Sequence, residues 1–309
     1  MRFIKSPKAE LLVQPDYTWD GMLMHIERCA RICYKSDREV TPESAHRFVQ
    51  ALVNRGHLSP LEHGNIFIKV PHIRTSVPIS DLELLSYIRD NKYVKTSTTP
   101  DDMDIMTVNM RVIQEFGNDT NIDKWRDMLE KYMVSPNDKD SSLFNWRITL
   151  KLIGIDIGVT REGNRHRVFS ILEQSTRYCN YSKAKFGNEL TYILPQWMQD
   201  VELDENGHIK DPICSMSVAY QKFFDQLRSA EKAYMDLLEE GWKPQQTRQI
   251  LPIDTATEVI YTGYEDAWSH FLDLRLQQST GAVHPNMLAA AKTILPVLNK
   301  FPYGDVLFF

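Results

Sequence analysis

Apolar residues recur at helical spacing in several segments of the chain, and these segments predict the helices. Within residues 19–34, one face of a helix carries Met22, Ile26, Cys29 and Cys33. A second helix is expected over TPESAHRFVQALVNRGH (41–57), whose threonine and proline are typical of a helix start. Further helices are expected near 80–90 and 121–134 and over residues 217–241, 243–252, 265–278 and 286–298.

Runs of β-branched and alternating apolar residues predict the strands. These runs are RFIKSPKAELLVQP (2–15), NIFIKV (65–70), NWRITLKLIGIDIGVT (145–160) and ATEVIYTGY (256–264). Strands and helices are mixed along the chain without strict βαβ alternation, which favours the α+β class: a mixed sheet with flanking helices. The chain contains no internal repeat, no P-loop and no GxGxxG fingerprint.

Residues 72–145 differ from the rest of the chain in their content of polar, loop-like stretches. The polar stretches TSTTPDDMD (96–104) and SPNDKDSS (135–142) are typical of loops, and they accompany the two helices expected near 80–90 and 121–134. We interpret 72–145 as an inserted subdomain within a single domain of residues 1–309. Such an insertion could extend a subunit interface, cover a binding site or bind a partner.

Composition and charge narrow the function classes. The 309 residues are 42% hydrophobic and 25% charged, with a net charge of −5 that argues against non-specific nucleic-acid binding. The four cysteines form no CxxC pair and have no histidines at metal-ligand spacing, so we expect free thiols and no metal site. No signal peptide and no stretch of ~20 apolar residues is evident, so a soluble, cytoplasmic protein is expected.

One short stretch, NRHRVFSILEQSTRY (164–178), concentrates positive charge in this acidic chain. If residues 166–177 form a helix, they divide into two faces: Val168, Ile171, Leu172 and Ser175 on one, and His166, Ser170, Glu173 and Arg177 on the other. Guanidinium groups bind phosphate in bidentate fashion and keep their charge, so the polar face could bind a nucleotide. The alternative is a solvated basic face that only confers solubility.

One pattern in this stretch resembles the RHR-x7-S-x-R signature of flavin-dependent thymidylate synthases. It consists of Arg165-His166-Arg167, seven further residues, and Ser175-Thr176-Arg177. Five further blocks resemble that family's sequences, in the family's order: CARICYKS (29–36), GHLSPLEH (56–63), RYCNYSKAKFGNEL (177–190), TRQILP (247–252) and HFLDLR (270–275). The resemblance covers most of residues 20–71 and 150–298, and leaves 72–145 outside it.

The resemblance implies a reaction and its cofactors. The family converts dUMP to dTMP with methylenetetrahydrofolate as carbon donor and NADPH as reductant, through bound FAD. It is typically a homotetramer with active sites between subunits. It uses no cysteine nucleophile, and we expect Cys179, two residues after Arg177, to be structural.

The resemblance also implies roles for individual residues. Those expected to contact FAD are His57, Ser59, Arg165, His166, Arg167, Glu173, Tyr264 and His270. Those expected to contact the nucleotide are Glu162, Arg165, Glu173, Ser175, Arg177, Arg248 and Arg275, with Ser175 and Arg177 reaching it from a neighbouring chain. Arg275 is expected to act in catalysis, because a cation beside the uracil ring would stabilise its ionised form.

Three positions depart from the family's usual residues. Glu162 stands where Gln is common, and Tyr264 and His270 stand where Asn is common. A carboxylate only accepts hydrogen bonds, so base recognition could differ. One alternative is therefore a flavin-dependent methylase or hydroxymethylase of another pyrimidine nucleotide, such as dCMP. Another is a non-catalytic nucleotide- or RNA-binding protein.

Overall fold

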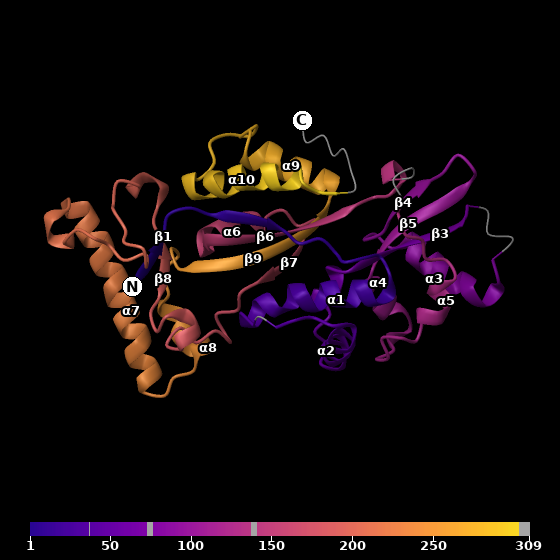
Figure 1. The fold of residues 1–309 in the computed structure, drawn as a ribbon, viewed down its shortest axis with the longest axis horizontal. Helices are drawn as coiled ribbons and strands as arrows, with labels where there is room; N and C mark the ends of the chain where they lie inside the picture. Colours follow the sequence, from indigo (N-terminus) through magenta and orange to yellow (C-terminus); the bar gives the residue numbers. More distant parts are fainter. Residues whose placement is uncertain (37, 73–76, 137–140, 303–309) are drawn as a thin grey trace.

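A four-stranded antiparallel sheet lies at the centre of the molecule (Figure 1). The computed structural model describes residues 1–36, 38–72, 77–136 and 141–302. In spatial order the strands are β2 (Lys8–Leu11), β6 (Arg147–Asp156), β9 (Ala256–Tyr264) and β7 (Ser170–Glu173). The longest pairing joins β6 to β9, with Arg147 opposite Tyr264 at one end and Asp156 opposite Ala256 at the other.

Helices cover both faces of this sheet (Figure 1). Helices α9 (Glu265–Arg275) and α10 (Pro285–Leu298) bury their apolar residues against one face, and α1 (Trp19–Ala30) lies on the opposite side with α2 (Pro42–Asn54) packed against it. The α2 helix starts as predicted, since the Thr41 side chain accepts a hydrogen bond from the Ser44 amide and Pro42 occupies the first turn. The α+β class and the flanking helices are thus confirmed.

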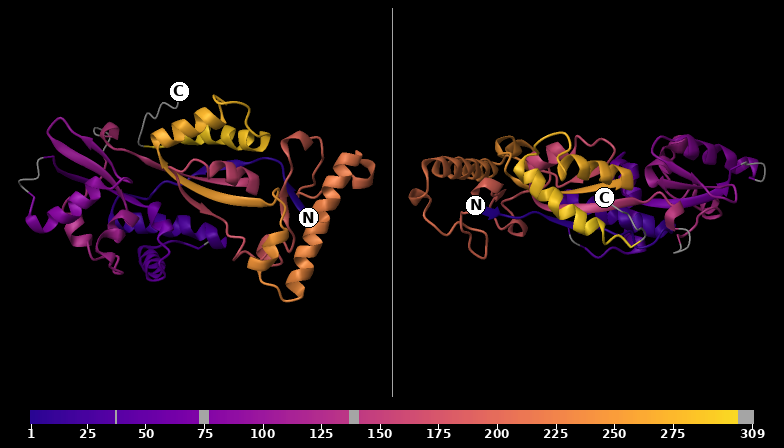
Figure 2. Two further views of the ribbon diagram at one scale, coloured as in Figure 1. Left: turned by 180° about the vertical axis from the view of Figure 1, so that it is seen from behind. Right: turned by 90° about the horizontal axis from the view of Figure 1, so that it is seen from above.

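A smaller unit stands at one end of the elongated molecule (Figure 2). Parallel strands β1 (Arg2–Ile4) and β8 (Thr191–Ile193) pack with the long helix α7 (Val218–Glu239) around a separate apolar core. The short helix α8 (Pro244–Thr247) follows α7. Both helices lie where the sequence predicts them. No helix in the described part of the chain is long and apolar enough to cross a membrane.

The 72–145 segment builds the opposite end of the molecule. Its strands extend β3 (Asn65–Pro71) into a three-stranded antiparallel sheet, in the order β3, β5 (Met103–Asn109), β4 (Lys95–Thr98). Its helices are α3 (Ile79–Asp90), α4 (Met110–Glu115) and α5 (Arg126–Glu130). The helix expected near 80–90 is confirmed, whereas the one expected over 121–134 contains only five residues.

The expectation of a loop at 96–104 was wrong. Most of that stretch belongs to the β4–β5 hairpin, whose turn is closed by a hydrogen bond from the Asp102 amide to the Thr99 carbonyl of 3.0 Å. Its threonines and serine carry β-propensity that the flanking proline and aspartates obscure. A polar, half-exposed edge strand therefore looks like a loop in the sequence.

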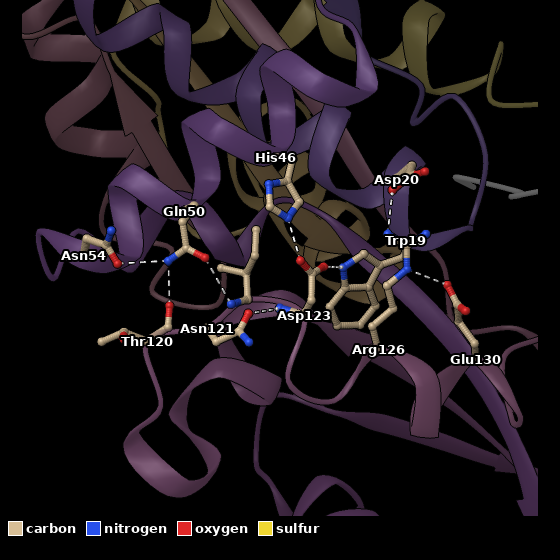
Figure 3. A network of polar contacts seen from close by, with 11 residues as sticks. Trp19, Asp20, His46, Gln50, Asn54, Thr120, Asn121, Asp123, Arg126 and Glu130 are labelled. Atoms are coloured by element: carbon tan, nitrogen blue, oxygen red, sulfur yellow. Dashed lines mark hydrogen bonds and ion pairs between the residues drawn. The ribbon is translucent and has the colours of Figure 1, made fainter.

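A polar network attaches the 72–145 segment to α1 and α2 (Figure 3). Asp123 accepts a hydrogen bond from the indole of Trp19 at 3.1 Å and contacts His46 at 2.5 Å. Gln50 donates to the Thr120 carbonyl at 2.6 Å. Because these contacts come from two helices of the main body, they fix the orientation of the segment relative to the central sheet.

Two buried histidines contact the central sheet: His25 from α1, and His63 from the segment between α2 and β3. His25 Nε2 lies 3.1 Å from the Thr149 hydroxyl, which lies 2.8 Å from that of Thr262, and His63 Nδ1 completes the chain at 2.7 Å. Burial lowers the pKa of both imidazoles, that of His25 to about 3. Both rings are therefore neutral at pH 7, and His63 has a structural role within the GHLSPLEH block.

We predict that acid destabilises the protein through His25. The His25 imidazole protonates below pH 6.5 in the unfolded chain but only near pH 3 in the folded protein. Protonation therefore favours the unfolded state, and the free energy of unfolding decreases as the pH falls from 6.5 towards 3. The expected loss of unfolding free energy from this group is about 2 kcal/mol at pH 5. Denaturant unfolding at pH 7 and pH 5 measures it. His25→Gln should reduce the difference between the two pH values; an equal difference in wild type and variant would refute the assignment.

Candidate active site

The RHR residues lie in a turn between a short helix and a strand. Helix α6 (Ile157–Gly163) follows β6 and begins at Asp156, whose side chain accepts the Val159 amide at 2.8 Å. It ends at Gly163, where a Cβ atom would lie 2.2 Å from the Tyr261 hydroxyl, so only glycine fits there. Successive turns then carry the chain through Arg165, His166 and Arg167 into β7.

The prediction of a helix over 166–177 was wrong. Residues 170–173 form strand β7, in which Ser170 and Leu172 are buried while Ile171 and Glu173 are half-buried. This is the alternation of a strand, and the pairing of β7 with β9 supplies its hydrogen bonds. Val168, assigned to the buried helix face, is 65% exposed. With so few apolar residues, the helical and strand periods cannot be distinguished.

A chain of polar contacts joins three of the predicted residues. The Arg275 guanidinium donates to the Glu162 carboxylate at 3.0 Å and to the Glu162 carbonyl at 3.2 Å. Its Nε donates to His166 Nε2 at 3.1 Å, so His166 accepts at that atom and carries its proton on Nδ1. The end of α9 is thereby tied to the RHR turn.

His166 is held neutral. It is buried, its ring lies 4.7 Å from that of Phe271, and burial together with the Arg275 charge lowers its pKa to about 4. His270 on α9 lies 5.9 Å away, ring to ring. A neutral His166 accepts a hydrogen bond from Arg275 and so helps to orient that guanidinium.

A cavity of about 670 Å³ opens beside the RHR turn. This volume is within the range of small-molecule and cofactor sites. Three of the residues expected to contact FAD line it: Arg167, Tyr264 and His270. Residues not expected from the sequence also line it, among them Glu62, Lys92, Tyr93, Lys95 and Arg147. The lysines and Tyr93 come from the 72–145 segment.

Other residues expected to contact FAD lie outside this lining. His57 and Ser59 are exposed near the start of the GHLSPLEH block, from which Glu62 rather than these two lines the cavity. Arg165 is exposed in the turn. Glu173 lies at the far end of β7, where its carboxylate accepts hydrogen bonds from Thr160 at 3.1 Å and Thr257 at 3.2 Å, and burial raises its pKa.

Three of the residues expected to contact the nucleotide gather beyond the far end of β7. Ser175 donates its amide to the Cys33 carbonyl at 3.1 Å, and Arg177 is exposed two residues later. Arg248 reaches the Thr176 hydroxyl at 3.5 Å, although more than seventy residues separate them in sequence. A second set of cations therefore lies at the opposite end of β7 from Ser170 and the cavity.

Sequence reasoning missed Arg147, although a signal for it was present. An arginine within the apolar run NWRITLKL is unusual, because an unpaired charge in a strand core is costly. Lys92 and Lys95 carried no such signal, since lysines are common in polar connections and only the tertiary fold brings these two to the cavity.

Comparison with known proteins identifies a family whose match contains the RHR signature and the three blocks that follow it. A family model described as thymidylate synthase complementing protein matches residues 95–301. The chain is 21% identical over 289 residues to a flavin-dependent thymidylate synthase of Aquifex aeolicus (strain VF5), covering 84% of this chain and 89% of that protein. It is 28% identical over 143 residues to one of Synechocystis sp. (strain ATCC 27184 / PCC 6803 / Kazusa), covering 45% of this chain and 60% of that protein.

Among solved structures, the chain is similar to a UMP/dUMP methylase PolB from Streptomyces cacaoi bound with 5-Br UMP. The identity is 15%, the alignment covers 97% of this chain and 92% of that one, and the TM-score is 0.42. The same protein bound with 5-Br dUMP gives the same TM-score. A similarity at this level supports no conclusion about the present site.

The contact between Arg275 and His166 predicts a change in imidazole titration. Arg275→Gln removes a positive charge 3.1 Å from His166 Nε2, so the His166 pKa should rise from about 4, while burial keeps it below 6.5. Glu162→Gln, which leaves the Arg275 charge unneutralised, should move it in the opposite direction. NMR titration of the His166 ring measures both shifts. Unchanged titration in both variants would show that Arg275 does not act on this histidine.

Proposed function

The chain belongs to the thymidylate synthase complementing protein family, and we propose that it is a flavin-dependent thymidylate synthase. The proposed reaction converts dUMP to dTMP, with methylenetetrahydrofolate as carbon donor and NADPH as reductant. The observation that carries the proposal is the arrangement around β7: the RHR turn borders a cavity of cofactor size at one end, and Ser175, Arg177 and Arg248 gather at the other.

The residues around the cavity fit an anionic, partly aromatic cofactor such as FAD. Arg147 is buried there without an acidic partner in the described residues, and its Nε has no hydrogen-bond partner among them. Arg167 adds a second cation, and Phe169 and Tyr264 add aromatic surface. Bound FAD would supply the hydride chemistry that side chains cannot perform. Arg167, Tyr264 and His270 are the residues expected to hold it.

Arg275 is proposed to act on the pyrimidine. A guanidinium beside the ring carbonyls would stabilise negative charge as the ring becomes electron-rich at the carbon that accepts the methylene group. Glu162 and His166 hold this guanidinium through three of its hydrogen bonds, so its orientation is set before the substrate binds. Ser175, Arg177 and Arg248 are proposed to bind the nucleotide phosphate.

The cysteines support a mechanism without a thiol nucleophile. Burial raises the pKa of Cys29 to about 12, that of Cys33 to about 11, and that of Cys179 above its usual value. A buried thiol held in its neutral form is a poor nucleophile at pH 7. Cys214 is exposed and is not among the residues that line the cavity.

We also propose that the active enzyme is a homotetramer with shared sites. A single chain presents the cavity and the Ser175–Arg177 group at opposite ends of β7, and the exposed Arg177 and Arg248 have no carboxylate partner among the described residues. Both features favour an arrangement in which these cations serve a site completed by a neighbouring chain.

The reaction is tested by product analysis. The protein is incubated with FAD, NADPH, methylenetetrahydrofolate and equal amounts of dUMP and dCMP, and the nucleotides are identified by mass spectrometry. We expect dTMP as the product. The second candidate is a flavin-dependent methylase or hydroxymethylase of another pyrimidine nucleotide. The ion pair between Glu162 and Arg275 favours it, because a guanidinium neutralised by a carboxylate stabilises a uracil anion less. A modified cytosine nucleotide or a hydroxymethylated product would establish this candidate. No product from a protein that binds no flavin would refute both.

Arg177→Ala should weaken dUMP binding more than FAD binding. Loss of one charge-assisted phosphate contact corresponds to about 1.5–3 kcal/mol, or roughly 10- to 100-fold in the dissociation constant. Calorimetric titration of each ligand measures the two effects separately. An equal loss of both affinities would contradict the assignment of Arg177 to the nucleotide phosphate.

Cys179→Ala should keep the turnover within a few-fold of wild type. The thiol is buried, and it lies 3.9 Å from the Cys33 carbonyl. Steady-state kinetics gives the turnover, and circular dichroism verifies the fold. A collapse of activity in a well-folded variant would show that the thiol takes part in the chemistry.

A further inference from the structure

The 72–145 segment closes one side of the cavity. The Tyr264 hydroxyl donates to the Tyr93 carbonyl at 3.0 Å and accepts the Lys95 amide at 3.2 Å. The Lys95 ammonium lies 2.6 Å from Asp266 and 4.6 Å from the centre of the Tyr264 ring. The start of β4 is therefore bound directly to the junction of β9 and α9, which carries the predicted cofactor residues.

The lining of the cavity carries positive charge that no carboxylate in the described part of the chain neutralises. The lining contains four cations, Lys92, Lys95, Arg147 and Arg167, and two carboxylates, Glu62 and Asp266. Both carboxylates already have cationic partners: Glu62 pairs with Arg111 at 2.5 Å, and Asp266 pairs with Lys95. Among the described residues, the other three cations form no ion pair. An excess of positive charge therefore faces the cavity.

Arg147 is the least expected of these cations. Only 9% of its surface is exposed, and its guanidinium donates to the Ser170 hydroxyl at 2.8 Å and lies 5.4 Å from the centre of the Tyr264 ring. Its Nε is buried without a hydrogen-bond partner among the described residues. Burial lowers its pKa from the ordinary arginine value. A buried charge without a counter-ion destabilises a fold, so an anionic ligand would relieve this cost.

We propose that Arg147 and Lys92, together with Arg167, bind the diphosphate of FAD, so that the 72–145 segment contributes a wall of the cofactor site. A diphosphate offers two negative charges and several acceptor oxygens, which match three unpaired cations better than a single carboxylate does. This inference rests on the proposed function, because it assigns the flavin cofactor to the cavity, and it adds residues that the sequence blocks do not contain.

The wall is fixed in place before a ligand binds. β5 pairs with β3 from Asn65 to Pro71, and β4 pairs with β5, so the turn that carries Lys92 continues directly into a paired strand. The Asp123 network holds the other side of the segment on α1 and α2 (Figure 3). Preorganised cations lose little conformational entropy on binding, which favours affinity.

The test compares flavins that differ in their phosphates. Protein stripped of bound flavin is titrated with FAD, FMN and riboflavin, and binding is followed by flavin fluorescence. The variants are Arg147→Met, Lys92→Ala and, as a control on the same segment, Lys131→Ala, whose lysine is exposed near Asp81 and is not among the residues that line the cavity. Arg147→Met should weaken FAD binding about 10- to 100-fold and Lys92→Ala about 3- to 10-fold. Riboflavin affinity should change little, and Lys131→Ala should leave all three affinities unchanged.

The thermal stability of the flavin-free protein is a second measurement, and we expect Arg147→Met not to lower it. Methionine has a similar length and no charge, so flavin-free Arg147→Met should have a thermal midpoint equal to or above that of flavin-free wild type. Reduced FAD affinity with preserved stability thus separates a binding role from a structural one. A clearly lower midpoint would show that Arg147 is part of the folded core and would overturn its assignment to the ligand.

The remaining outcomes separate the two proposals. If wild type binds FAD and the Arg147 and Lys92 variants bind it within two-fold of wild type, the inference fails and the proposed function stands. The same conclusion follows if riboflavin and FAD affinities fall equally. If wild type binds none of the three flavins, the proposed function fails and the inference fails with it.

Discussion

The pairing of β6 with β9 is the constraint on which the rest of the site depends. Its register places Arg147 opposite Tyr264, at the point where β9 continues into α9. β7 pairs along the other edge of β9, which brings Ser170 within reach of the Arg147 guanidinium. At its other end β6 leads into α6 and the RHR turn. A shift of one residue in this register would turn Arg147 to the opposite face of the sheet.

Electrostatics explains why such a site would be maintained. The cavity sets a buried, unpaired arginine beside two further unpaired cations, an arrangement that costs folding free energy in the absence of an anion. The neighbouring polar groups are neutral or already paired: His166 has a pKa of about 4, and Glu162 is bound to Arg275. Positive charge is thus reserved for a ligand, and stability is reduced locally where binding would restore it.

Much of the fold could be predicted from the sequence, and most of the cavity wall could not. Helices α2, α7 and α9 follow their periodicity and caps, and strands β6 and β9 follow their apolar runs. The few apolar residues of the RHR stretch fit both the helical and the strand period. Its hydrogen bonds to β9 make residues 170–173 a strand. Of the residues that the family resemblance implies for FAD, Arg167, Tyr264 and His270 line the cavity. Lys92 and Lys95 lie about 50 residues from Arg147 in sequence, and only the tertiary packing of β4 on Tyr264 brings them to the same cavity.

The most direct test of this account is a crystal structure of the protein with FAD and dUMP. The account predicts FAD in the cavity beside the RHR turn, with its diphosphate in contact with Arg147 and Lys92 and its ring system near Tyr264 and His270. Flavin bound elsewhere, for instance in the separate cavity of about 550 Å³ lined by Arg31, Lys35 and Lys151, would contradict it.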